Sequence, residues 1–256
     1  MITSGGNKLV KEIRALELKK NRDAQGVFVV EGERFADEIP KDWPVRMFVV
    51  SQSFPLKEKY KNRAETVEVS DAVFKMFSDT VTPQGVLAVC EQKNFGLECL
   101  RGAENPFVLV GEKIADPGNL GTLIRTADAA ACDAVILSTG SADVYGSKVV
   151  RAAAGSVFHL PIVKEAELSE ILPALKNLGV RVAAAHLKAD KPPYAADFRR
   201  GCAILIGNEA NGLSEEAANM SDELIKLPMP GKAESLNASV AGALLLYEVV
   251  RQRLYA

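Results

Sequence analysis

Short apolar runs rich in β-branched residues alternate with more polar segments through the first hundred residues. Runs of this length and composition are typical of β-strands, and the segments between them, such as 55–63 and 71–78, suit helices. This alternation predicts an α/β unit. The four predicted strands are VFVVEG (27–32), VRMFVV (45–50), TVEV (66–69) and VLAVC (86–90).

The second half carries further apolar runs, separated by helical patterns. Strands this apolar are typical of a parallel sheet that helices cover on both faces. The last predicted helix, from about Leu236 to Leu254, is apolar nearly all round. The predicted strands are FVLVG (107–111), AVIL (134–137), FHLPIV (158–163), VRVAAA (180–185), AILIG (203–207) and ELIKL (223–227).

The periodicity lapses between Glu91 and Pro106, in a polar connection that contains glycine. We place a domain boundary near residue 103. The result is a smaller first domain, residues 1–103, and a larger second domain, residues 104–256. The predicted fold class is α/β, with a parallel sheet in the second domain.

The first predicted helix, residues 7–20, carries a local excess of positive charge. The whole chain has a net charge of -2 and a pI near 5.9, so any polyanion has to be held by a local patch. A solvated helix face is an equally simple explanation of this charge. The basic residues of the patch, set against the acidic Glu12 and Glu17, are Lys8, Lys11, Arg14, Lys19, Lys20 and Arg22.

No segment of the sequence is long and apolar enough to cross a membrane. The longest strongly apolar stretch, Ala241 to Tyr247, falls short of the roughly 18 residues required. The first residues lack the apolar core of a signal peptide, so we expect a cytoplasmic protein. The cysteines form no C-x-x-C pair, so we expect four reduced thiols and no metal site. They are Cys90, Cys99, Cys132 and Cys202.

Several familiar signatures are absent, among them a G-x-G-x-x-G after the first strand of either half, G-x-x-x-x-G-K-[ST], H-E-x-x-H and G-x-S-x-G. The sequence therefore disfavours four common kinds of site: those that bind dinucleotides, those that bind nucleoside triphosphates, and those of zinc proteases and α/β-hydrolases. Polar residues concentrate instead at three strand ends, in residues 115–130, 207–216 and 227–248.

In the first of these stretches, residues 116–118 make a turn, and Asn119 can cap the helix that follows. Arg125 lies six residues further on, about 240° of net rotation around a helix, so Asn119 and Arg125 do not share a face. A capped helix with a solvated arginine would give the same pattern.

In the second stretch, Gly207 and Glu209 follow a buried strand and emerge at its carboxyl end, where open α/β sheets bind ligands. Turn chemistry alone is the alternative. In the third stretch, Ser235 can cap the last helix, and Asn237 stands among apolar residues. Because an unpartnered buried amide costs roughly 1–3 kcal/mol, we predict a partner or a ligand for Asn237.

Together, in this order and spacing, the three stretches resemble the three motifs of the SpoU (TrmH-type) RNA ribose 2'-O-methyltransferases, one branch of the SPOUT superfamily. The resemblance covers roughly residues 105–254. The first hundred residues resemble, more loosely and through the basic helix and FVVEGERF (28–35), the substrate-binding domain of many members, which is akin to ribosomal-protein RNA-binding folds. The resemblance implies a SPOUT domain with a parallel sheet and a deep trefoil knot, S-adenosylmethionine as cofactor, and an active site at a homodimer interface.

Matched position by position, the motifs imply catalytic roles for Asn119, Arg125, Glu209, Ser235 and Asn237. Ala238, where many members carry valine, is a departure that does not touch the chemistry. The six basic residues of the first helix are expected to contact RNA. Cofactor contacts are implied at Gly207, Leu227 and Leu236, with Thr139 and Gly140 as weaker candidates.

A ribose 2'-hydroxyl is a poor nucleophile, so the site has to hold two reactants at about 3–3.5 Å and remove a proton. The family proposal makes the first-motif arginine the base. We expect Arg125, contributed across the dimer, to orient the hydroxyl and the neighbouring phosphate, and to accept the proton only if its pKa is lowered. Ser235 and Asn237 would hold the hydroxyl or shape the cofactor loop, and Glu209 would fix Arg125 or Asn119. No metal is needed, because the leaving group is cationic and departs neutral.

The implied function is S-adenosylmethionine-dependent 2'-O-methylation of a ribose in RNA, with ribosomal RNA favoured by the added N-terminal domain. Four alternatives stay open at this point. They are a transfer RNA 2'-O-methyltransferase, a non-catalytic RNA-binding or ribosome-assembly protein on the same fold, base N-methylation by another SPOUT branch, and an unrelated nucleotide-binding α/β enzyme.

Overall fold

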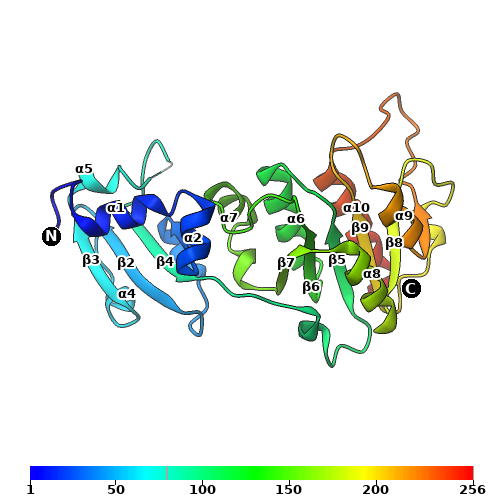
Figure 1. Cartoon of the computed structure of the whole chain (residues 1–256), viewed down its shortest axis with the longest axis horizontal. Helices are drawn as coiled ribbons and strands as arrows, with labels where there is room; N and C mark the ends of the chain where they lie inside the picture. Colours follow the sequence, from blue (N-terminus) through cyan, green and yellow to red (C-terminus); the bar gives the residue numbers. More distant parts are fainter. Residues whose placement is uncertain (79, 256) are drawn as a thin grey trace. The chain divides into compact units, whose positions relative to one another are not determined.

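The computed structural model describes residues 1–78 and 80–255, and its contacts divide the chain into two compact units (Figure 1). The first unit comprises Met1–Lys93 together with Tyr145–Phe158, and the second comprises Asn94–Val144 together with His159–Ala256. Neither unit is one continuous stretch of chain, because residues 145–158 pack with the first unit although they lie in the second half of the sequence.

The first unit is built on a four-stranded mixed sheet in the order β1-β4-β2-β3. β4 pairs antiparallel with both β1 and β2, while β2 and β3 pair in parallel. All four strands predicted in this half are confirmed, and each differs from its predicted range by one residue at one end. Their bounds are Val27–Glu31 (β1), Val45–Ser51 (β2), Glu65–Val69 (β3) and Val86–Glu91 (β4).

Short helices flank this sheet. Val10 and Ile13 of α1 are buried against a core that includes Val27, Leu87 and Val89 of β1 and β4. The segments expected to suit helices hold α4 and α5, each a single turn. The helices of this unit are α1 (Lys8–Ala15), α2 (Lys19–Gln25), α3 (Glu33–Glu38), α4 (Glu58–Lys61), α5 (Asp71–Phe74), α7 (Ser147–Ala153) and the 3-10 turn η2 (Ser156–Phe158).

The single basic helix predicted over residues 7–20 is wrong, because the chain turns between α1 and α2. Arg22 donates from Nη1 to the carbonyl oxygens of Leu16 at 2.5 Å and Glu17 at 2.8 Å, which lie just past the end of α1. These bonds satisfy carbonyls that a helix end leaves open. Arg22 is consequently 6% exposed and does not form part of the outward basic face that the sequence predicted.

Aromatic packing explains why residues 145–158 belong to the first unit. The ring of Phe28 on β1 lies 4.4 Å from that of Tyr145 and 5.7 Å from that of Phe158, between centroids. Phe158 also meets Trp43 edge-on at 4.9 Å. Large buried aromatic side chains of this kind contribute strongly to a core.

The second unit contains a six-stranded, all-parallel sheet in the order β10-β8-β9-β5-β6-β7. The predicted parallel sheet is confirmed, and β5, β6 and β9 are buried at every position. The run FHLPIV is only partly a strand, because Phe158 closes a 3-10 turn and Pro161, which has no N–H, precedes β7. The strands are β5 (Phe107–Gly111), β6 (Ala134–Ser138), β7 (Ile162–Ala166), β8 (Arg181–Ala185), β9 (Cys202–Ile206) and β10 (Glu223–Ile225).

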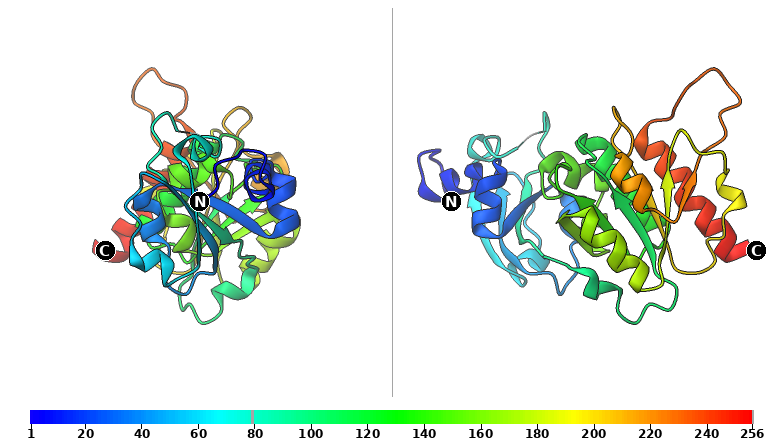
Figure 2. Two further views of the ribbon diagram at one scale, coloured as in Figure 1. Left: turned by 90° about the vertical axis from the view of Figure 1, so that its left-hand side faces the viewer. Right: turned by 45° about the vertical axis from the view of Figure 1, so that its right-hand side comes forward.

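Helices cover both faces of this sheet (Figures 1 and 2). α6 and α10 lie side by side on one face, and α8 and α9 pack together on the other. No helix among the described residues is long and apolar enough to cross a membrane. The trefoil knot implied by the resemblance stays a prediction. The helices are α6 (Pro117–Ala129), α8 (Leu168–Asn177), α9 (Glu215–Met220), α10 (Ala238–Tyr255) and the 3-10 turns η1 (Leu97–Leu100) and η3 (Pro193–Ala195).

Gly242 allows α6 and α10 to approach closely, because a Cβ there would lie 2.4 Å from Leu123 Cδ2. We expect Gly242→Ala to lower the free energy of unfolding, since overpacking costs about 1–3 kcal/mol and exceeds the gain of about 1 kcal/mol in helix propensity. Denaturant titration of the variant, of Leu123→Val and of the double variant measures the coupling between the two sites. A Gly242→Ala protein as stable as the parent would contradict the close packing.

All four cysteines are unpaired, as predicted. Burial raises the pKa of the Cys90 thiol to about 12 and that of the Cys202 thiol to about 11, and it also raises the pKa values of Cys99 and Cys132. Thiols of this kind stay protonated at neutral pH and behave as small apolar side chains.

Candidate functional site

The carboxyl ends of β8, β9 and β10 and the segment that leads into α10 enclose a cavity of about 290 Å³ in the second unit. Parallel α/β sheets bind ligands at this edge, because successive loops diverge there. Its apolar lining includes Ile206, Leu227, Leu236 and Leu245, and its polar lining includes His186, Glu209 and Ser235. The cavity therefore offers both an apolar wall and a polar rim.

Gly207 lines this cavity and packs so closely against the backbone of the following loop that no side chain fits at its position. A Cβ there would lie 2.3 Å from the backbone carbon of Gly212 and 2.4 Å from the nitrogen of Leu213. Asn208 and Gly212 exchange backbone hydrogen bonds of 3.0 and 2.9 Å, which fold residues 208–212 back over Gly207. At Gly207 the backbone, with no side chain over it, therefore forms part of the cavity wall.

Of the five residues expected to contact a cofactor, three line this cavity: Gly207, Leu227 and Leu236. Thr139 and Gly140 do not. Both follow β6, which the sheet order separates from β9 by β5. Thr139 donates from Oγ1 to Glu167 Oε1 at 2.8 Å, at a separate cavity.

A polar cluster adjoins the cavity and joins the three sequence motifs. Asn119 donates from Nδ2 to Glu209 Oε1 at 3.0 Å, and its Oδ1 accepts from Asn237 Nδ2 at 2.9 Å. Ser239 Oγ lies 2.6 Å from Asn237 Oδ1 and 3.2 Å from Asn119 Oδ1, so its single proton is shared between two acceptors. We call these four residues, Asn119, Glu209, Asn237 and Ser239, the amide cluster. The sequence predicted a partner or a ligand for Asn237, and Asn119 is that partner.

The helix caps differ from the sequence prediction, and the difference explains the cluster. Asp116, not Asn119, caps α6 and accepts from the Asn119 backbone N–H at 2.7 Å. Asn237, not Ser235, precedes α10 and accepts from the backbone N–H groups of Ser239 at 2.9 Å and Val240 at 3.3 Å. The Asn119 amide is thereby left for the cluster.

Ser235 lines the cavity but takes no part in the hydrogen bonds of the amide cluster. The cluster instead contains Ser239, which the sequence analysis missed. The available signal was a hydroxyl two residues after an asparagine, in a helix whose first ten residues, 238–247, contain no charged side chain. Ser239 is 6% exposed, so its hydroxyl needs the partners it has.

Glu112 is a second residue that sequence reasoning missed. It directly follows β5, is 6% exposed, and accepts from the Ser214 backbone N–H at 2.8 Å through Oε2. Ser214 in turn caps α9, because its hydroxyl oxygen accepts from the Ala217 backbone N–H at 3.1 Å. Glu112 therefore anchors the loop that follows Gly212.

Arg125 stands apart from the cluster within one chain. It is exposed on α6, about 9 Å along the helix axis from Asn119 and on a different face. Glu209 bonds to Asn119, one of the two partners expected for it. The three motifs are therefore joined through Asn119, and Arg125 takes no part in these hydrogen bonds.

The remaining candidates are the basic residues of the first unit. Lys8 and Lys19 are exposed and form ion pairs with Glu12 at 3.8 Å and Asp23 at 3.5 Å. Exposed pairs of this kind contribute little and do not prevent either lysine from meeting another anion. The exposed members of the basic set are Lys8, Lys11, Arg14, Lys19 and Lys20.

Comparison with known proteins agrees with this geometry. Residues 106–247 match the profile described as the SpoU rRNA Methylase family, and residues 7–88 match an MRM3-like substrate binding domain. The chain is 34% identical to the 23S rRNA (guanosine(2553)-2'-O)-methyltransferase RlmP of Bacillus subtilis. The alignment spans 249 residues and covers 97% of this chain and 98% of the relative. It is 30% identical to the 23S rRNA (uridine(2479)-2'-O)-methyltransferase of Streptomyces viridochromogenes, over 92% of this chain and 86% of that one.

Among solved structures, an S-adenosylmethionine-bound rRNA methyltransferase from Sinorhizobium meliloti superposes with a TM-score of 0.91 at 32% identity, covering 100% of this chain and 98% of the other. The sequence match, the parallel sheet and the joined motifs lead to one conclusion: this chain belongs to the SpoU rRNA methylase family.

Proposed function

We propose that this protein transfers the methyl group of S-adenosylmethionine to a ribose 2'-oxygen of ribosomal RNA. The observation that carries the proposal is the cavity beside Gly207, bordered directly by the amide cluster. The relatives named above, both 23S rRNA 2'-O-methyltransferases, support this substrate. We accordingly expect the reaction to take place in the cytoplasm.

The residues of the cavity fit the cofactor. Bare backbone at Gly207 and the ends of β8 and β10 suit a flat ring and its hydrogen-bonding edge, while Leu227 and Leu236 supply apolar contact. S-Adenosylmethionine supplies an electrophilic methyl group on a cationic sulfur, which departs neutral, so the reaction asks for no metal.

The catalytic residues we propose act by positioning. Glu209 and Asn237 hold the Asn119 amide in one orientation, and Ser235 at the cavity edge is free to meet the ribose. Arg125 of a second copy orients the 2'-hydroxyl and its phosphate, because a guanidinium matches phosphate geometry with two parallel hydrogen bonds. Holding the reactants in line supplies much of the rate.

We infer a homodimer from α10, which exposes one apolar face. Val240, Leu244 and Tyr247 are 47%, 49% and 51% exposed and recur at helical spacing. We propose that a second copy of the chain covers this face. Arg125 forms no hydrogen bond with the amide cluster of its own chain, and α6, which carries it, packs beside α10. A dimer through α10 would therefore bring Arg125 of one copy toward the amide cluster of the other.

Leu244→Glu should therefore give a monomer, since a charge cannot be buried in an apolar interface without a partner. Sedimentation velocity measures the change, and methyl transfer should be lost with it. Leu178→Glu, at a leucine that is 48% exposed beyond α8, is the matched control and should stay dimeric. A dimeric Leu244→Glu protein would contradict this interface.

We assign RNA binding to residues 1–103 and catalysis to residues 104–256, with residues 145–158 belonging by sequence to the second part and by contacts to the first unit. The exposed basic residues on α1 and α2 would contact phosphates, and their contribution should weaken as salt is raised.

The test is incubation of labelled S-adenosylmethionine with unmodified total RNA, followed by fractionation and alkaline hydrolysis. We expect label in ribosomal RNA and one phosphodiester resistant to alkali, because a ribose methyl removes the attacking 2'-hydroxyl. Label in transfer RNA alone would select the alternative substrate, and alkali-sensitive label would indicate base methylation. Cofactor binding without label in any RNA would indicate a non-catalytic protein.

A further inference from the structure

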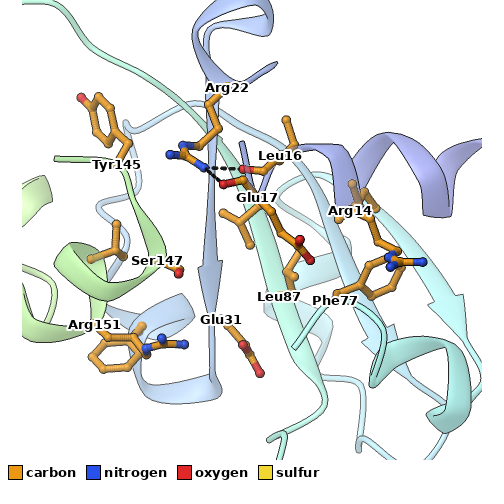
Figure 3. Close-up of a pocket in the computed structure, with 14 residues that line it drawn as sticks. Arg14, Leu16, Glu17, Arg22, Glu31, Phe77, Leu87, Tyr145, Ser147 and Arg151 are labelled. Atoms are coloured by element: carbon orange, nitrogen blue, oxygen red, sulfur yellow. Dashed lines mark hydrogen bonds between the residues drawn. The ribbon is translucent and has the colours of Figure 1, made fainter. Parts of the chain in front are cut away.

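The first unit contains a cavity of about 240 Å³ whose lining residues, apart from Arg14, have no part in the roles proposed above (Figure 3). It lies where α1 and α7 meet one face of the sheet at β1 and β4. Both segments of this unit, Met1–Lys93 and Tyr145–Phe158, therefore contribute lining residues. The α7 side would be missing if residues 145–158 did not pack here. The lining residues are Ile13, Arg14, Leu16, Glu17, Arg22, Val29, Glu31, Phe35, Phe77, Leu87, Tyr145, Ser147, Val150 and Arg151.

The floor of this cavity is apolar. Val29 and Leu87 project from neighbouring strands on the same face of the sheet, since Glu31 pairs with Leu87 and Val29 with Val89. Phe35 and Phe77 add aromatic surface. Aromatic and aliphatic side chains at the base of a cavity give a flat ring a place to stack.

The walls carry both signs of charge. Three guanidinium groups, those of Arg14, Arg22 and Arg151, line the cavity, and the Arg22 group is held in place by its bonds to Leu16 and Glu17 (Figure 3). The carboxylates of Glu17 and Glu31 also line it. Glu31 is fixed by the hydroxyls of Ser78 and Thr80, the second at 3.1 Å.

These features match a nucleotide. Guanidinium groups bind phosphate, carboxylates accept hydrogen bonds from the N–H groups of a base, and an apolar floor stacks the ring. Pockets for drug-sized ligands measure about 300–1,000 Å³, so this cavity suits one base with its phosphate and excludes a stacked pair. Sequence-specific recognition of RNA commonly uses unstacked bases of this kind.

We propose that this cavity binds one unpaired nucleotide of the RNA substrate, distinct from the nucleotide that is methylated. The base rests on Val29, its N–H groups meet Glu17 and Glu31, and its phosphate meets Arg151 (Figure 3). The inference rests on the proposed function, because it takes RNA as the substrate. It gives the first unit a means of selecting RNA that a charged surface alone does not provide.

The experiment titrates the full chain with AMP, CMP, GMP and UMP, and with ribose 5-phosphate and inorganic phosphate, by ligand-observed NMR. We expect at least one nucleotide to bind about tenfold more tightly than ribose 5-phosphate, since the base contributes stacking. Arg151→Gln should weaken the binding of that nucleotide severalfold, because it removes a charge-assisted phosphate contact. Arg34→Gln, at a 75% exposed arginine on α3 outside the lining, should bind as the parent does.

Ser147→Trp tests whether the cavity has to be open for a nucleotide to bind, and it leaves the charge of the lining unchanged. Ser147 is exposed at the first residue of α7, so an indole there fills the cavity mouth without entering the core. It should abolish nucleotide binding and raise the KM for RNA about tenfold, with S-adenosylmethionine affinity unchanged as the check on folding. Nucleotide and RNA binding equal to the parent in Ser147→Trp would overturn the proposal, as would phosphate binding as tightly as every nucleotide.

The two proposals fail separately. If the parent methylates RNA and the cavity variants do so with unchanged KM, the nucleotide site is wrong and the methyltransferase stands. If the nucleotides bind and the cavity variants lose them, but the parent transfers no methyl group to any RNA, the methyltransferase is wrong and the nucleotide site stands.

Discussion

Replacing Arg125 with alanine is expected to reduce methyl transfer to RNA by about 10²–10³-fold, the loss typical of removing one preorganised charged donor from an active site. S-Adenosylmethionine affinity should stay within about twofold of the parent, because Arg125 lines no part of the cavity beside Gly207. Single-turnover transfer and calorimetric titration of the cofactor measure the two quantities. A collapse of cofactor affinity would show that the proposed role is wrong.

Arg125→Lys separates charge from geometry. Lysine keeps the positive charge but cannot make two parallel hydrogen bonds to a phosphate, so we expect it to recover only a small part of the rate. Full activity in Arg125→Lys would mean that Arg125 contributes charge alone and does not orient the ribose.

The second large effect is expected at Gly207. An alanine Cβ would lie 2.3 and 2.4 Å from backbone atoms of Gly212 and Leu213, and backbone cannot move aside as a flexible side chain can. Overpacking of this kind costs about 1–3 kcal/mol, so Gly207→Ala should bind S-adenosylmethionine about 10–100-fold more weakly. Isothermal titration measures the loss. Gly231→Ala, in a neighbouring loop with open space around the new Cβ, is the control and should bind as the parent does.

Together the two variants test whether Arg125 acts across the dimer. In a dimer of one Arg125→Ala and one Gly207→Ala subunit, the first keeps an intact cofactor cavity and the second keeps an arginine to serve it. Random mixing makes half of the dimers mixed, each with one intact site of two, so about one quarter of the parent activity should return. If Arg125 served its own chain, mixing would restore nothing.

Much of the second unit follows from local pattern. Continuous apolar runs predicted a parallel sheet, and its six strands lie close to the positions expected from the sequence. The polar residues at three strand ends were identified in the same way, and Asn119, Glu209 and Asn237 do meet. Local pattern sufficed here because side-chain period and strand ends are properties of short segments.

The errors concern side chains whose hydrogen-bond partners could not be read from the neighbouring sequence. Asp116 and Asn119 are both good caps for α6, as are Ser235 and Asn237 for α10, and sequence alone gave no reason to prefer either. Arg22 was counted with the surface lysines because its sequence neighbours are charged, yet it folds back onto the end of α1. Each choice depends on partners that only the folded chain supplies.

By itself the sequence determined most of the strands, the parallel sheet and the three polar stretches, because hydrophobic period and motif spacing are local quantities. Tertiary structure alone decided that Asn119 joins Glu209 to Asn237 and Ser239, that Thr139 does not line the cavity beside Gly207, and that residues 145–158 pack with the first unit. The physical reason is the same in each case. A hydrogen bond across about a hundred residues, or a ring packed on a distant strand, has an energy that no short segment encodes, so its partner is fixed only when the chain is folded.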